Sequence, residues 1–569
     1  MSIKRYLLAG ALLFVLTDGS GQQLEAAQQA IDAEKYHLAG TMLKTLQRTS
    51  SKKGAAYYYL GEVYMKTGNV DSARTMFKQG TQSESKFTLN YVGLGEDALN
   101  QGNIAAAKVN FDKAISLSKK RKFETPLAVA NAYINASQSN FPAALTYLKK
   151  ADELDKADQS AEIYLAWGNY YAGQRDLNAG LENYMKALVL DSNLTRASLQ
   201  IGKMYVDARQ YAQADSLLTA LSSARPDYGP TYRVMSAMYR DQYLTDSTNK
   251  QAATSASRYY QKYLDATGRT FDGLLNYAQL LYDLRDFKNL EKEVGTLSTM
   301  YTSNKFKSSK VLRLRGYSAY ENKNYPAALQ YLNSLFSVTD NVKEIKADDY
   351  QYLSLVHQAL RSPQLAYDNA MKAIKLDPTK TAAMENVALS FYKNKDWLKA
   401  VELYASMKSM GAKPVNVAAI NLYYGTALYF QYVEAYNRQG NAATNMLSQA
   451  VALYDEALRI SPEQVIAHMW KARALHLLED PYNNRGLMLL SYQAYIDGSE
   501  RSDKPQTAAT KRNIVEAYTV MANFAIRKND KDSARNYWNK VLLLDSQNPD
   551  AIAGMKALNG TSRNARKSY

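Results

Sequence analysis

Few side chains in this 569-residue sequence are of types that carry out covalent or metal chemistry. There is no cysteine, so the sequence predicts no disulfide, no thiolate nucleophile, no cysteine-type zinc site and no lipid-anchored cysteine. The four histidines are His37, His357, His468 and His476. His468 and His476 are eight residues apart, whereas a metal-binding pair on one helix face is spaced by four. We therefore expect no metal, no cofactor and no catalytic residue.

Other signatures of catalysis are also missing from the sequence. Gly93 and Gly95 have the spacing that opens a phosphate-binding glycine loop, but the third glycine of that loop does not follow. The patterns GxxxxGK[ST], GxSxG and HExxH do not occur. Carboxylates are scattered along the whole chain, which is typical of solvated surface. The sequence therefore predicts a protein that is not an enzyme.

The elements that position any functional side chain follow from an internal repeat of about 34 residues. Within 54–87, an aromatic residue precedes Leu60-Gly61, and Ala73 and Phe77 follow in the second half. Shifted copies of this frame carry equivalent residues at Tyr91, Leu94, Gly95, Ala107 and Phe111, at Tyr164, Trp167, Gly168, Tyr171, Gly180 and Tyr184, and at Ile201, Gly202, Tyr205, Ala214, Leu218 and Pro226.

This pattern resembles the tetratricopeptide repeat, with its Leu-Gly, Tyr and Ala-x3-Phe positions and a closing proline. The resemblance implies an all-α fold, a right-handed α-solenoid of tandem helix-turn-helix repeats. Frames start near residues 20, 54, 88, 125, 161, 195, 229, 271, 309, 347, 381, 418, 465 and 515, which predicts about fourteen units. Small residues let helices approach and aromatics fill the hollows, so most of the 46 tyrosines are expected to serve packing.

The repeats divide the chain into regions that differ in how well the copies match. We predict a signal peptide at 1–21, an N-terminal array at 22–267, a degenerate middle array at 268–414, a C-terminal array with longer insertions at 415–560, and a basic disordered tail at 561–569. Three stretches exceed the repeat length: 241–254, 430–448 and 478–508. They are either tolerated surface loops or part of a binding face.

Residues 1–21 are typical of a secretory leader. Lys4 and Arg5 precede the apolar run 6–16, and a small residue, Gly21, suits cleavage after it. Eleven apolar residues are too few to span a bilayer, which takes about 20. The alternative is an uncleaved N-terminal anchor. We expect a periplasmic or secreted protein with no transmembrane segment after signal removal, of a secreted Gram-negative, Bacteroidetes-like type, with peripheral membrane association left open.

Repeats of this kind present a concave groove, and the resemblance places groove-facing side chains at fixed positions of each first helix. The alternative for each of these residues is simple exposed surface. The expected partner-binding residues are Tyr58, Glu62, Glu96, Arg196, Lys203, Arg233, Arg240, Glu385 and Tyr392.

Three function classes fit a repeat chain with a formal charge of +16. The resemblance favours a non-enzymatic scaffold of the cell envelope that binds a protein partner through its groove. The alternative is a glycan-binding outer-membrane receptor subunit, similar to the SusD-like starch-utilisation lipoproteins, which the missing lipid-anchor cysteine disfavours. We expect no nucleic acid partner, because the basic residues are dispersed and the leader predicts export.

Overall fold

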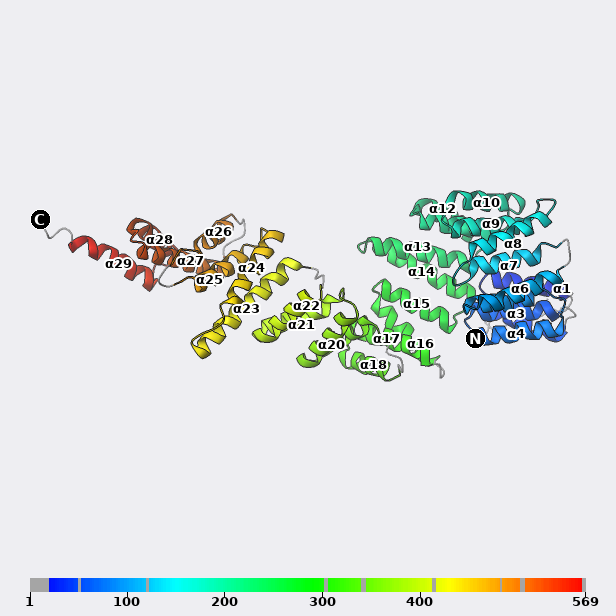
Figure 1. The fold of residues 1–569 in the computed structure, drawn as a ribbon, viewed down its shortest axis with the longest axis horizontal. Coiled ribbons are helices and arrows are strands. Elements are labelled where there is room, and N and C mark those ends of the chain that lie inside the picture. Colours follow the sequence, from blue (N-terminus) through cyan, green and yellow to red (C-terminus); the bar gives the residue numbers. More distant parts are fainter. Residues whose placement is uncertain are drawn as a thin grey trace, which may run out of the picture. The chain divides into compact units, whose positions relative to one another are not determined.

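The computed structural model describes residues 20–49, 53–118, 122–300, 305–338, 344–411, 416–480, 484–501 and 507–564. These residues form 29 helices and no strand (Figure 1). From α1 to α28, consecutive helices pair into fourteen hairpins, and α29 follows the last hairpin. The all-α fold of helical hairpins predicted from the repeat pattern is therefore confirmed.

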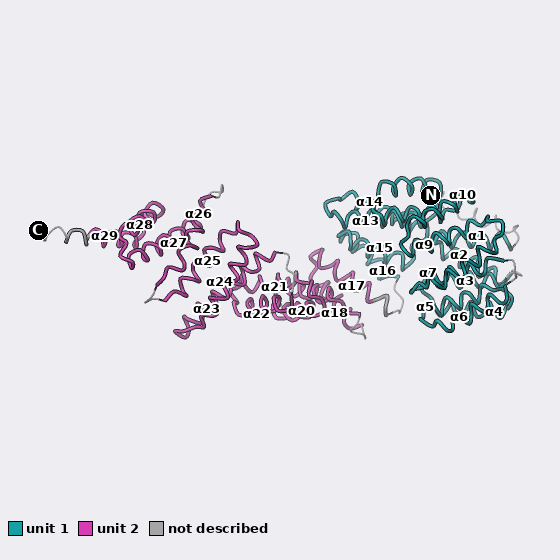
Figure 2. The backbone as a smooth tube through the Cα atoms, turned by 45° about the horizontal axis from the view of Figure 1, so that its top comes forward, with its two compact units in different colours: residues 1–302 teal, residues 303–569 magenta. Residues whose placement is uncertain are grey.

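The helices belong to two compact units, residues 1–302 and 303–569, which Figure 2 shows in teal and magenta. Unit 1 holds α1 (Ser20–Asp32), α2 (Tyr36–Thr49), α3 (Lys53–Lys66), α4 (Val70–Ser83), α5 (Leu89–Asn100), α6 (Ile104–Leu117), α7 (Glu124–Asn135), α8 (Phe141–Leu154), α9 (Ala161–Gly173), α10 (Leu177–Leu190), α11 (Thr195–Asp207), α12 (Tyr211–Ala224), α13 (Gly229–Thr245), α14 (Lys250–Thr267), α15 (Phe271–Asp283) and α16 (Phe287–Thr299).

Unit 2 continues with the same hairpin pattern. It holds α17 (Lys305–Glu321), α18 (Tyr325–Val338), α19 (Ala347–Ala359), α20 (Pro363–Leu376), α21 (Thr381–Lys393), α22 (Trp397–Ser409), α23 (Val417–Gln439), α24 (Asn445–Ile460), α25 (Ile466–Leu478), α26 (Leu489–Glu500), α27 (Ala508–Arg527), α28 (Lys531–Leu544) and α29 (Pro549–Asn564).

The first helix of each hairpin begins within one residue of the expected frame in twelve of the fourteen units. The exceptions are α17, which begins at Lys305 instead of near 309, and α27, which begins at Ala508 instead of near 515. Both are longer than the usual first helix, with 17 and 20 residues. The three predicted arrays differ in how well their copies match the repeat pattern, whereas the two units differ in packing. The boundary between the units therefore does not test the three arrays, which remain a prediction.

Two of the three regions longer than one repeat are lengthened helices, and the third, 478–508, lies partly outside the described residues. Over 241–254, α13 and α14 extend to 17 and 18 residues. Over 430–448, α23 runs for 23 residues and ends at Gln439. Gly440 caps it with a φ of +71°, the left-handed conformation that glycine adopts easily. At the chain ends, residues 1–19 and 565–569 lie outside the described residues, and α29 extends to Asn564, into the region predicted to be disordered.

Within a hairpin, a glycine on one helix faces a large ring on the other. Phe77 of α4 is fully buried, and a Cβ atom added to Gly61 of α3 would lie 2.2 Å from its Cε1 atom. A Cβ atom added to Gly93 of α5 would lie 2.5 Å from the same ring atom. The same pairing joins Gly95 to Phe111. These glycines are therefore packing residues, as the repeat pattern predicts.

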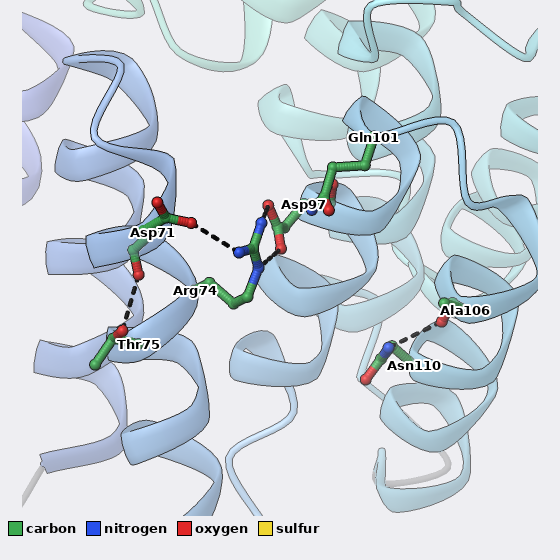
Figure 3. Close-up of polar contacts among 7 residues, drawn as sticks. All are labelled: Asp71, Arg74, Thr75, Asp97, Gln101, Ala106 and Asn110. Carbon is green, nitrogen blue, oxygen red and sulfur yellow. Dashed lines mark hydrogen bonds and ion pairs between the residues drawn. The ribbon is translucent and has the colours of Figure 1, made fainter.

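Polar side chains also join one hairpin to the next, as Figure 3 shows for α4 and α5. The Arg74 guanidinium donates to both carboxylate oxygens of Asp97, at 2.6 and 3.1 Å, and to Asp71 at 2.9 Å. Asp97 is only 3% exposed, so its charge needs this bidentate partner. The interface between neighbouring repeats therefore contains at least one buried ion pair besides its apolar core.

Candidate partner-binding groove

The first helices of five consecutive hairpins in unit 1 line one cavity of about 430 Å³. We call this cavity the unit 1 groove. Its walls combine aromatic, amide and charged side chains instead of a purely apolar surface. The lining residues come from α3 (Tyr58, Tyr59, Glu62, Lys66), from α5 and the residue before α7 (Leu89, Glu96, Phe123), from α7 (Glu124, Leu127, Ala128, Asn131, Ala132, Asn135), and from α9 and α11 (Glu162, Leu165, Ala166, Asn169, Arg196).

Four residues expected from the sequence, Tyr58, Glu62, Glu96 and Arg196, lie in this one cavity. The ring of Tyr58 also packs against Tyr59, with centroids 5.0 Å apart, and against Phe77 at 6.0 Å. Tyr58 therefore belongs partly to the core and partly to the groove wall. As binding residues, all four remain predictions.

Glu62 and Glu96 are the carboxylates of the groove floor. Burial, with the neighbouring charge of Glu96, raises the pKa of Glu62 to about 8, while Lys66 opposes the shift. Burial also raises the pKa of Glu96. Among the described residues, no hydrogen-bond donor reaches Glu62 Oε1, which is a buried atom. Two carboxylates in one hollow cannot both ionise easily, so the pair retains a proton near neutral pH.

Arg196, at the other end of the groove, is already neutralised. Its Nε atom lies 3.2 Å from Asp32 Oδ2, and its Nη2 atom pairs with Glu162 Oε1. Asp32 comes from the end of α1, so the first hairpin reaches across unit 1 to α11.

The turn between α1 and α2, residues 33–35, makes further contacts with the sixth and seventh hairpins. Glu34 has a left-handed φ of +59°, and its carboxylate accepts from Arg233 at 2.6 and 3.2 Å and from the Tyr263 hydroxyl at 2.9 Å. Lys35 pairs with Asp227 at 3.2 Å. Ala33, which is 3% exposed, belongs to the apolar cluster of α11 to α14. The N-terminal turn therefore occupies the basic face where a partner was expected at Arg233.

The other expected basic residues lie along this same face but outside the cavity. Arg240 of α13 pairs with Asp283 of α15 at 2.9 Å. Lys203 of α11 is exposed, and partial burial of its ammonium group, with the nearby positive charge of Arg233, lowers its pKa. Arg233 and Arg240 are therefore engaged within the protein, and Lys203 is the expected basic residue left facing solvent.

Glu385 and Tyr392 belong to α21 of unit 2, whereas the other expected residues belong to unit 1. The Tyr392 ring packs edge-on against Trp397, with ring centroids 5.4 Å apart. It also packs at a tilt against Tyr423, with centroids 5.1 Å apart. Glu385 Oε1 is buried, and no donor reaches it among the described residues.

A second cavity, of about 340 Å³, lies in unit 2 and was not anticipated. Arg473 lies over the ring of Trp470, 4.5 Å from its centroid, and forms a bidentate pair with Glu516 at 2.9 and 2.6 Å. His476 also lines this cavity, and burial lowers its pKa. Four aromatic side chains, those of Tyr429, Phe430, Trp470 and Tyr492, line this cavity beside the Arg473–Glu516 pair.

Sequence reasoning missed several groove residues for different reasons. Glu162 occupies the same repeat position as Arg196, one frame earlier, so the same rule would have found it. Asn131 lies in a unit with a poor match to the repeat, which hid its position. Glu34 lies 199 residues from Arg233, and no local pattern connects them.

The described residues contain no group of three or more His, Asp or Glu side chains arranged to hold a metal ion. Of the helices that the structure describes, none has both the length and the apolar character that a bilayer crossing requires.

Comparison with known proteins supports the repeat assignment. A family model described as tetratricopeptide repeat matches residues 24–82. A search of curated proteins finds no match. Among solved structures, the C-terminal part of a repeat-containing protein from Cytophaga hutchinsonii is 21% identical, with 50% of this chain and 99% of that chain covered and a TM-score of 0.36.

Two further solved structures are similar at the same low level. The pilF protein of Pseudomonas aeruginosa is 20% identical over 39% of this chain and 94% of its own, with a TM-score of 0.29. A tetratricopeptide repeat protein from Parabacteroides merdae is 11% identical over 47% of this chain and 98% of its own, with a TM-score of 0.30. Likenesses this weak say nothing about what the chain binds. Residues 24–82 therefore match the tetratricopeptide repeat, and twelve of the fourteen hairpins begin in the frame expected for such repeats, which generally form non-enzymatic scaffolds for protein–protein interaction.

Proposed function

We propose that this chain is a non-catalytic scaffold that binds an extended segment of a partner protein in the unit 1 groove. The observation that carries the proposal is the cavity of about 430 Å³, to which five consecutive first helices contribute side chains. A groove shared by five repeats suits an elongated ligand, because each repeat offers a few contacts along its length.

The chemistry of the groove walls supports a polypeptide ligand. Asn131, Asn135 and Asn169 offer amide donors and acceptors that can bind a backbone, while Tyr58 and Tyr59 offer aromatic surface. Asn169 Oδ1 accepts from the Tyr184 hydroxyl at 2.9 Å, which fixes the orientation of its amide toward the groove. A pre-oriented amide loses little conformational entropy when it binds a ligand.

We further propose that the protein acts in the cell envelope. This part of the proposal rests on the signal-like residues 1–21, which lie outside the described structure except for the start of α1. A fusion of residues 1–40 to a reporter that is active only after export tests it. An inactive fusion, compared with an active fusion to a known leader, would refute the export proposal.

Affinity capture from envelope extracts tests the binding proposal. The baits are the mature protein, an Asn131→Trp variant that fills the groove, and a Val189→Trp variant. Val189 on α10 is 86% exposed and does not line the groove, so this substitution is the matched control. We expect the wild-type and Val189→Trp proteins to capture the same partner and Asn131→Trp to lose it.

Two results would contradict the proposal. Equal capture by the Asn131→Trp variant would place the contact outside the groove. Retention of a polysaccharide, without any protein, would favour a glycan-binding subunit. Thermal unfolding by circular dichroism shows whether each variant is folded before capture.

A further inference from the structure

The charged groups of the unit 1 groove differ in whether an oppositely charged group pairs with them. Arg196 is paired with Asp32 and Glu162. Glu62 and Glu96 share the opposite end with Lys66, a residue that is exposed at the groove edge. The groove therefore has an acidic end, where the two carboxyl groups of Glu62 and Glu96 share one nearby cation, Lys66.

The Glu62 carboxylate is the strongest sign of a missing ligand. Its Oε1 atom is buried, and no donor of the described residues reaches it. A buried acceptor without a donor is costly, so such groups are rare unless something binds them. Burial and the charge of Glu96 raise the pKa of Glu62 to about 8, because the opposing charge of Lys66 offsets only part of these two effects.

The same chemistry recurs in unit 2 at expected groove positions. Gln351 of α19 and Glu385 of α21 occupy the fifth positions of the frames that start at 347 and 381, and each has a buried Oε1 atom that no described donor reaches. Buried side-chain oxygen atoms that no described donor reaches therefore occur at expected groove positions in both units.

We propose that the unit 1 groove selects a partner segment that carries a lysine or arginine, whose cationic side chain sits between Glu62 and Glu96 beside the rings of Tyr58 and Tyr59. This inference rests on the proposed function and names the chemistry of its ligand. A cation donates to the unpartnered carboxylate oxygen, and an aromatic face adds a favourable cation–π contact. Because the whole chain carries +16, its long-range field opposes a basic segment, and the selectivity must come from this local acidic end.

A random dodecapeptide library displayed on phage tests the selectivity. The library is panned on the full chain, on the double variant Glu62→Gln/Glu96→Gln, and on Glu153→Gln, which changes an exposed glutamate of α8 outside the groove. We expect lysine or arginine to be enriched several-fold on the wild-type and Glu153→Gln proteins and to lose that enrichment on the double variant.

Calorimetry with one selected peptide measures how much the basic side chain contributes to affinity. Replacing its basic residue with norleucine keeps the length of the side chain and removes the charge, and we expect affinity for the wild-type chain to fall about tenfold. This comparison needs no protein variant, so it decides the question even if the double variant fails to fold.

The pH dependence of binding provides a second readout. A bound cation favours the ionised form of Glu62, so binding lowers the Glu62 pKa and releases protons, and affinity should rise from pH 6.5 to pH 8.5. In Glu62→Gln this rise should disappear or become much smaller. The charged and titratable groups that line the groove with Glu62 are Tyr58, Tyr59 and Lys66 of α3, Glu96 of α5, Glu124 of α7, Glu162 of α9 and Arg196 of α11.

The outcomes separate this inference from the proposed function. The selected peptides could fail to bind Asn131→Trp and yet be neutral or acidic. That result would keep the groove as the binding site and overturn the cation inference alone. A library with no enriched sequence, or peptides that bind Asn131→Trp as well as wild-type, would overturn both.

Discussion

Replacing Gly61 with alanine tests the packing rule of the repeats. The new Cβ atom would lie 2.2 Å from Phe77 Cε1, well inside ordinary contact distance. The ring has little room to retreat, because Gly93 of the neighbouring repeat also packs close to it: a Cβ atom added there would lie 2.5 Å from Phe77 Cε1. Overpacking of this kind costs about 1 to 3 kcal/mol. Alanine returns up to about 1 kcal/mol through its higher helix propensity.

The net expectation is a destabilisation of about 2 kcal/mol, the upper part of the overpacking range less the propensity gain. Hydrogen exchange followed by mass spectrometry is the suitable assay, because repeat arrays open locally. Protection of peptides from α3 to α5 should fall about 30-fold at this energy. Adding Phe77→Leu to Gly61→Ala should restore part of this protection, because Gly202 already packs against a leucine, Leu218, in the hairpin of α11 and α12.

Gly295 is the matched control for this substitution. It lies within α16, and a Cβ atom there would meet nothing within 4 Å. Gly295→Ala should therefore stabilise its helix by about 0.5 to 1 kcal/mol and increase protection of α16 peptides. If Gly61→Ala were neutral or stabilising, as Gly295→Ala should be, the reasoning about close approach would be refuted.

Three other predictions concern charged groups. Glu34→Ala should raise exchange in the turn of the first hairpin and in α13, because it leaves Arg233 without its carboxylate. Unchanged exchange would mean that Ala33 and the Lys35–Asp227 pair hold the turn without Glu34. Asp349→Ala should cost about 3 to 5 kcal/mol in unit 2, because Arg313 pairs with Asp349 at 2.7 Å in a buried site, and urea unfolding monitored by circular dichroism would measure it. Stability of unit 1 should fall as pH rises from about 5 to 8, by up to about 1.4 kcal/mol per pH unit. The pKa of Glu62 is about 8 in the folded state against an ordinary 4.5, so between these values the folded state holds a proton that the unfolded state has lost. The melting temperature of Glu62→Gln should therefore depend less on pH than that of the wild-type protein.

The fold could be predicted because the signal that specifies it is local and repeated. Gly61 and Phe77 lie 16 residues apart, and the same pair of sizes returns at a fixed period, so one unit explains the others. The start of α27 at Ala508 was missed because this helix is longer than the usual first helix of a repeat, and the residues before the repeat frame carry no repeat signal.

The candidate site was predicted only in part. Tyr58, Glu62, Glu96 and Arg196 were found because groove positions recur in each frame. The pairing of basic groove residues with the first hairpin was not found, because it depends on how seven hairpins curve and bring residues 199 apart into contact. The buried Arg313–Asp349 pair was missed for another reason: isolated charges in a sequence are read as surface, and burial depends on neighbouring helices.

Site-specific photocrosslinking tests the central claim most directly. A benzoylphenylalanine residue replaces Asn131 in the groove or, as the control, Val189 on α10, in cells that make the protein and its natural partners. The account predicts a protein adduct from position 131, with the crosslink mapped by mass spectrometry to an extended segment that contains lysine or arginine, and no such adduct from position 189. Adducts from position 189 without any from position 131 would contradict binding in the unit 1 groove.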